Sequence, residues 1–141
     1  MGKFRQKGMR LRFMVKIEFS KDAVVLIVDV FLEHMFTQRK LRMAVDTGAS
    51  CIMIPWDVAL ALGLTPELSS EKIEIVTASG TEVAPVVYIG RVRVGDRECL
   101  NVRAVVHDLP QKGYVDGLLG LSFLKYFNLN INFKEGVMSL D

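Results

Sequence analysis

The sequence predicts a mostly β fold with one or two short helices, in a single chain of 141 residues. Half of the residues are hydrophobic, which is enough for one core in one main domain. The apolar residues occur in short runs rich in Val and Ile, and Gly, Pro, Asp or Ser separates these runs. The longest wholly apolar run, Ala23 to Val28, is far shorter than the roughly 20 residues of a membrane-spanning helix.

The first residues form a basic segment with the pattern of a strand. Residues 1–21 hold seven Lys or Arg and one Glu, a net charge of +6, whereas the rest of the chain carries −4. From Met9 to Phe19, apolar residues alternate with mostly basic ones, which is the period of a strand with one buried face. We therefore expect an N-terminal extension with an extra strand at residues 1–22 and the main domain at residues 23–141. Contact of this segment with nucleic acid or an acidic membrane is the less favoured alternative.

The other elements follow from β-branched runs that end at turn residues. Strands are expected at residues 24–32, 39–46, 51–54, 73–77, 82–88, 91–94, 100–106, 129–133 and 137–140. Short helices are expected at residues 56–62, ended by Gly63, and at residues 122–128. Hairpin turns are expected at residues 78–80 and 95–96.

The most informative motif is Asp46-Thr47-Gly48-Ala49-Ser50, which directly follows an apolar strand. A carboxylate at the end of a buried strand contributes little to apolar packing. The strand fixes its position, however, and a fixed carboxylate is suited to catalysis. Gly48 lets another backbone come close, and the hydroxyl of Thr47 can fix the loop by a hydrogen bond. An ordinary turn is the alternative interpretation, because Asp and Gly are common turn residues.

A second motif, Gly117-Leu118-Leu119-Gly120, follows about seventy residues later. The two motifs in this order resemble the retropepsin-like aspartic proteases, and most closely their single-domain cellular members. The resemblance covers roughly residues 23–140. It implies a closed β-barrel of the acid-protease type, in which a side chain at Gly120 would collide with the loop that follows Asp46.

The resemblance also assigns roles to single residues. Asp46 would be the catalytic carboxylate, Thr47 would form a hydrogen bond across a two-fold axis, and Gly48 would accept a substrate N–H through its carbonyl. The residues expected to contact substrate are Ala49 and Ser50 in the loop and Ala78, Ser79 and Gly80 in a flap hairpin. The residues expected to support the site are Gly117, Leu118, Leu119 and Gly120.

The number of carboxylates predicts the assembly. This chemistry uses two carboxylates side by side, one as general base on water and one as acid. No second aspartate begins Asp-Thr-Gly or Asp-Ser-Gly, so one chain supplies half a site. We therefore expect a homodimer, held partly by a sheet built from both chain ends, that cleaves an extended polypeptide. The alternative is a module of the same fold that binds a peptide or partner without turnover.

Three positions depart from the retroviral members of this family. Ser50 stands where those enzymes have an acidic residue, Leu121 and Ser122 follow Gly120 where they have an arginine nearby, and Gly80 is the sole glycine of the expected flap tip. The contacts between subunits and the movement of the flap are therefore expected to differ from those of the retroviral enzymes.

Other chemistries find little support in the sequence. His34 and His107 are isolated, and Cys51 and Cys99 are far apart, so we expect no metal and no cofactor. The glycines of the second motif lack the Lys-Ser/Thr of a phosphate loop. A Cys-His hydrolase using Cys51 is conceivable, but a thiol in such an apolar context usually packs as a small hydrophobe. Two cysteines fit a reducing compartment, and a cytoplasmic location is expected.

Overall fold

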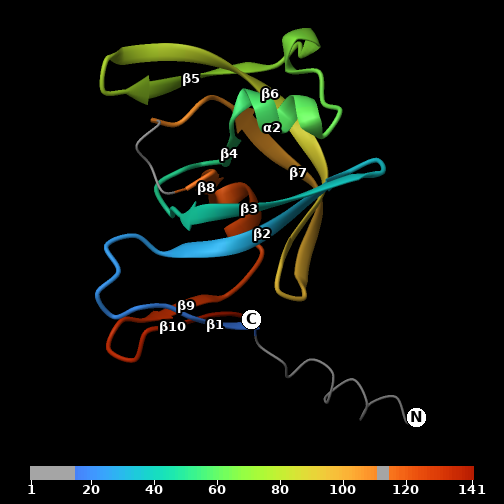
Figure 1. The fold of residues 1–141 in the computed structure, drawn as a ribbon. Coiled ribbons are helices and arrows are strands. Elements are labelled where there is room, and N and C mark those ends of the chain that lie inside the picture. Colours follow the sequence, from blue (N-terminus) through green and yellow to red (C-terminus); the bar gives the residue numbers. More distant parts are fainter. Residues whose placement is uncertain (1–14, 111–114) are drawn as a thin grey trace, which may run out of the picture.

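The computed structural model describes residues 15–110 and 115–141, and these residues form a mostly β fold (Figure 1). The prediction of the fold class is confirmed. The described residues contain ten strands and only short helices, none of which is long and apolar enough to cross a membrane. Two sheets are present, one of seven strands and one of three.

Six strands of the larger sheet close into a barrel, because the first strand of the series also pairs with the last. In sheet order they are β2 (Ile27–His34), β3 (Thr37–Val45), β8 (Gly117–Leu119), β4 (Ile52–Ile54), β7 (Arg97–Val106) and β6 (Gly80–Val94). Side chains alternate between the core and the outside, as in β2, where Val28, Val30 and Leu32 are buried. Parallel pairing joins β3 to β8 and β4 to β7, and it brings the two sequence motifs side by side.

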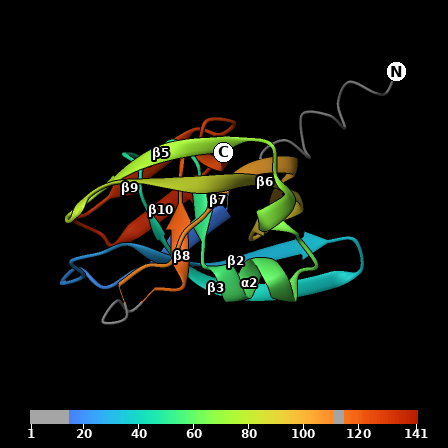
Figure 2. The same cartoon turned by 90° about the horizontal axis from the view of Figure 1, so that it is seen from above.

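The seventh strand, β5 (Lys72–Thr77), pairs only with the first part of β6. The resulting hairpin extends beyond the barrel, and its tip lies on the left of the molecule in Figures 1 and 2. The turn between β2 and β3 lies on the opposite side.

The smaller sheet has the order β1 (Val15–Glu18), β10 (Val137–Leu140) and β9 (Leu129–Asn132), and it lies next to the barrel (Figure 1). Strand β1 therefore pairs with the C-terminal strands within one chain, and a sheet shared between two chains stays a prediction. Met138 and Leu140 point into the main core and are 1% and 0% exposed. Deleting residues 129–141 would therefore remove core side chains and destabilise the fold.

The helices are α2 (Trp56–Ala61), the 3-10 turn η1 (Pro66–Leu68) and α3 (Leu121–Leu124). Helix α2 ends one residue earlier than expected, and Gly63 follows in a left-handed conformation with φ +82°. Helix α3 is shorter than the expected 122–128, because the amides of Tyr126 and Phe127 bond three residues back and tighten the chain into turns.

Several strand predictions are wrong in their bounds. Residues 82–88 and 91–94 belong to one strand, β6, which continues through Gly90. The Gly90 N–H donates to Nδ1 of His34, and a Cβ at Gly90 would lie 3.2 Å from the carbonyl oxygen of Glu33, so this glycine permits the close crossing of β2 and β6. The strand expected at residues 24–32 starts only at Ile27. Of the strand pattern from Met9 to Phe19, residues 9–14 lie outside the described residues.

Candidate active site

Asp46 directly follows β3, and local hydrogen bonds fix the loop that it begins. Its backbone N–H donates to the carbonyl of Leu119 at 3.0 Å, which continues the pairing of β3 with β8. The N–H of Gly48 donates to Oδ1 of Asp46 at 2.9 Å, and the N–H of Ala49 donates to the carbonyl of Asp46 at 3.2 Å. The carboxylate is thus held by its own loop through Oδ1.

The second motif packs directly against this loop. A Cβ at Gly120 would lie 2.4 Å from the carbonyl oxygen of Cys51 and 2.6 Å from that of Ala49, distances that real Cβ atoms do not adopt. The N–H of Leu121 donates to the carbonyl of Ala49 at 2.8 Å. Only glycine at position 120 allows this contact between two backbones.

Gly117 and Ser122 also shape the loop. A Cβ at Gly117 would lie 2.6 Å from the carbonyl oxygen of Met53, so β8 could not approach β4 so closely with a larger residue. The hydroxyl of Ser122 accepts the backbone N–H of Ile52 at 2.9 Å and ties the end of the loop to α3. Sequence reasoning noted Ser122 only as a departure from the retroviral pattern. The hydrogen bond that gives Ser122 its structural role joins residues 70 positions apart in the sequence, so no local sequence pattern indicates this role.

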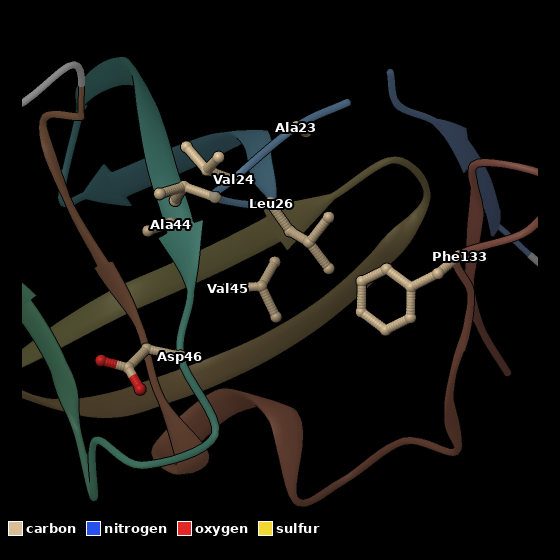
Figure 3. A pocket seen from close by; sticks show the side chains of 8 residues that line it. Ala23, Val24, Leu26, Ala44, Val45, Asp46 and Phe133 are labelled. Carbon is tan, nitrogen blue, oxygen red and sulfur yellow. The ribbon is translucent and has the colours of Figure 1, made fainter. Parts of the chain in front are cut away.

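A cavity of about 350 Å³ lies beside Asp46. Its lining residues are mostly apolar, and among them Asp46 is the single ionisable residue: Ala23, Val24, Val25, Leu26, Ala44, Val45, Asp46 and Phe133. Figure 3 shows Leu26, Val45 and Phe133 directed toward one another, whereas the Asp46 carboxylate points away from them. Val24 is 96% exposed and Phe133 is 64% exposed, so a patch of apolar surface stands open next to the carboxylate.

The expected flap residues lie at the tip of the β5–β6 hairpin. Ala78 and Ser79 form the turn, and Gly80 has φ +128°, a conformation that favours glycine. The hydroxyl of Thr77 donates to the carbonyl of Gly80 at 2.9 Å and lies 3.2 Å from the hydroxyl of Ser79. The tip is therefore braced by side-chain hydrogen bonds, although it contains a single glycine.

A second cavity, of about 540 Å³, lies between this hairpin and the barrel. Its walls come from β4, β5, β6, β8 and the segment after β7: Met53, Ile75, Val76, Thr77, Ala78, Ser79, Glu82, His107, Asp108, Leu109, Pro110 and Leu118. Asp46 does not line it. Thus the two parts of the predicted site line separate cavities in a single chain, although Leu118 on this cavity pairs with Ala44 on the other.

An ionic cluster lies behind the loop. The Arg103 guanidinium on β7 binds the carboxylate of Glu71, and the hydroxyl of Tyr88 donates to the same carboxylate at 3.0 Å. Arg103 also donates to the thiol of Cys51 at 3.3 Å, so the cluster reaches the residue that follows Ser50. Cys51 itself is 6% exposed and packs in a core cluster with Ala84, Val86 and Val105, as expected for a buried packing residue.

The hydrogen bond from Arg103, helped by that from Tyr88, holds the pKa of Glu71 below its ordinary value of 4.5. A carboxyl group with a lowered pKa in the folded state stabilises the fold above that ordinary value, and the contribution is lost as the pH falls through the lowered pKa. The cluster therefore stays intact in the mildly acidic range.

The histidines and cysteines, which are the candidates for metal or thiol chemistry, do not form a common site among the described residues. Within residues 15–110 and 115–141, no three His, Cys, Asp or Glu side chains come together as a metal site would need. Both cysteines are free thiols, and burial, helped by the charge of Glu98, raises the pKa of Cys99. His34 accepts the Gly90 N–H, and His107 pairs with Glu82.

A closed barrel with Asp-Thr-Gly at the end of one strand, and a Gly-bounded apolar motif packed against it, defines the retropepsin-like aspartic protease fold. Residues 32–126 match the family described as gag-polyprotein putative aspartyl protease, and the chain belongs to this family. The resemblance predicted from the two motifs is thereby confirmed.

Two known proteins illustrate the similarity. A crystal structure of a retropepsin-like aspartic protease from Rickettsia conorii superposes with a TM-score of 0.68 at 24% identity, over 91% of this chain and 98% of that one, which shows the shared fold. An "Uncharacterized protein in cobV 5'region" from Sinorhizobium sp is 34% identical over 87 residues, or 61% of this chain. The matched region is 36% of that protein, so the chain spans about a third of its length.

Proposed function

We propose that this chain is an aspartic endopeptidase that works as a homodimer, with one Asp46 from each subunit. One observation carries the proposal: the Asp46 carboxylate is anchored through Oδ1, and among the described residues that line the neighbouring cavity no other carries a carboxylate. Peptide hydrolysis of this kind needs a second carboxylate close by. A two-fold axis next to Asp46 would supply it and would cover the open apolar patch at the same time.

In the proposed dimer, one carboxylate takes a proton from water while the other, protonated, polarises the scissile carbonyl. Two carboxylates in contact share a proton, because both cannot ionise easily. No covalent intermediate forms, since water is the nucleophile. Thr47 and Gly48 are exposed in the single chain, where they can meet the second subunit and the substrate backbone.

The substrate in this proposal is an extended polypeptide that adds as a strand beneath the β5–β6 hairpin. The cavity below that hairpin is lined largely by apolar side chains such as Met53, Ile75 and Leu118. It therefore suits a bulky apolar substrate side chain, whose burial contributes binding energy.

The test is digestion of a denatured protein by the purified chain in mildly acidic solution. We expect cleavage that a statine-type inhibitor blocks, and a bell-shaped activity profile on the acidic side of neutral, because the shared proton is gained and lost in two steps. A folded protein that binds such peptides but never cleaves them would instead support the binding-module alternative. Activity independent of pH would contradict the carboxylate mechanism.

The dimer can be tested at the open patch. Val24→Asp should give inactive monomers, because it places a charge in the apolar surface next to Asp46 that the second subunit would cover. The fold should be unaffected, since Val24 is 96% exposed. Sedimentation, thermal unfolding and the digestion assay would be measured together.

Leu68→Asp is the matched control for this change. Leu68 is also a mostly exposed aliphatic residue, at 76%, but it lies in η1 and lines neither of the two cavities. The control should remain dimeric and active. An active Val24→Asp monomer would contradict the homodimer proposal.

A further inference from the structure

One contact between a histidine and a glutamate side chain connects the β5–β6 hairpin to the barrel. Nε2 of His107 lies 3.0 Å from Oε1 of Glu82. His107 directly follows β7, and its backbone N–H donates to the carbonyl of Ile54 on β4 at 2.9 Å, so the barrel fixes its position. Glu82 lies near the start of β6, in the part of this strand that pairs only with β5. Its partner in the β5–β6 register is Ile75.

The pair continues into the hairpin tip through Thr77. The hydroxyl of Thr77 donates to the carbonyl of Gly80 at 2.9 Å and lies 3.4 Å from Oε2 of Glu82. A line of polar contacts thus runs from the barrel through His107, Glu82 and Thr77 to the turn. The hairpin and the barrel are held together on the rim of the 540 Å³ cavity.

The strength of this contact depends on the charge of its two side chains. Glu82, His107 and Asp108 are the titratable groups among the residues that line this cavity, and they come from β6 and from the segment after β7. The Asp108 carboxylate accepts the backbone N–H of Trp56 at 3.0 Å, so it is engaged at α2. A hydrogen bond between an imidazole and a carboxylate is stronger when the imidazole carries a proton on both nitrogens, because the bond is then charge-assisted.

We propose that Glu82 and His107 are positioning residues that hold the β5–β6 hairpin closed over the apolar cavity in mildly acidic solution. Closure of a lid of this kind excludes water and retains the substrate. Its effect on catalysis rests on the proposed function, whereas the effect on the hairpin itself does not. The hydrogen-bond partners of the Glu82 carboxylate are Thr77 on the hairpin and His107 after β7, so the pair acts through the hairpin and not on the reacting atoms.

The first measurement is amide hydrogen exchange of residues 75–83 in the full-length protein, corrected for intrinsic rates, at about pH 5.5 and about pH 7.5, on either side of the ordinary imidazole titration. The wild-type hairpin should be protected at the lower pH and lose protection at the higher one. His107→Gln and Glu82→Gln should both lower the protection at the lower pH and remove the difference. The double variant should exchange no faster than either single variant.

Glu74→Gln is the matched control, because Glu74 is an exposed glutamate on β5 of the same hairpin and does not line the cavity. It should leave the exchange pattern unchanged. Thermal unfolding of each variant separates a loosened hairpin from a loosened fold. Wild-type protection in a folded His107→Gln variant would overturn the proposal.

The second measurement is the steady-state kinetics of the same variants. Loss of the pair should raise KM several-fold in mildly acidic solution while kcat stays nearly constant, and wild-type KM should rise as the pH passes above the imidazole range. A change in kcat alone would contradict a role through the hairpin. If the wild type shows no turnover but the exchange results hold, the proposed function fails and the hairpin contact stands.

Discussion

Asp46→Asn should abolish peptide hydrolysis, with turnover falling roughly 10³-fold or more, because neither general base nor general acid remains in a symmetric dimer. The amide oxygen of the new side chain can still accept the Gly48 N–H, so the loop should keep its shape. Extended peptides should still bind, since binding depends on backbone hydrogen bonds and apolar contacts. Turnover and peptide affinity would be measured on the same preparation.

Asp116→Asn is the control for this change, because Asp116 also precedes a glycine. Its carboxylate accepts the backbone N–H of Arg42 at 2.9 Å, a contact that an amide oxygen can replace. Turnover should therefore survive in the control. The assignment of Asp46 fails if Asp46→Asn keeps wild-type turnover, or if a folded Asp116→Asn variant loses it.

Gly120→Ala should be the most destabilising single methyl addition near the site. The new Cβ would meet the carbonyl oxygens of Cys51 and Ala49, which are backbone atoms and cannot rotate away as a side chain can. Overpacking against fixed atoms ordinarily costs about 1–3 kcal/mol, and this contact, far inside van der Waals distance, should reach about 3 kcal/mol or more. Chemical denaturation measures the free energy of unfolding directly.

Gly63→Ala provides the comparison for this variant. Nothing lies within 4 Å of a Cβ at Gly63, but its φ of +82° makes any side chain strained. The expected cost is about 1–2 kcal/mol, from the backbone alone. If Gly120→Ala is no more destabilising than Gly63→Ala, the loop after Asp46 can shift, and the second motif does not hold it rigid.

Local patterns were sufficient to predict the fold class and most of the strands. The motif around Asp46 and the apolar pair before Gly120 predicted the family, because both need specific residues at fixed places in the chain. The prediction of separate strands at residues 82–88 and 91–94 was wrong because Gly90 looks like a turn residue in isolation. It becomes a strand residue only through its contact with His34 on β2.

Contacts between distant segments were not visible in the sequence. The pairing of β1 with β10 in one chain depends on register, which a single alternating pattern cannot define. The Glu82–His107 pair joins residues 25 positions apart on different elements, and each looks like an ordinary exposed polar residue in sequence. The roles of the site residues remain predictions that the variants above can test.

The parallel pairing of β3 with β8 also affects how the protein folds. Met43 pairs with Gly117 and Val45 with Leu119, so segments more than seventy residues apart must meet before the Asp46 loop gains its hydrogen-bonded frame. Closing so long a loop is entropically costly, and domains dominated by such non-local pairings fold in milliseconds to seconds rather than microseconds. We therefore expect the loop to take its shape only once β3 and β8 have paired. In a chain in which these strands have not yet paired, Asp46 would lack this frame, so the proposed hydrolysis would have to wait for the pairing.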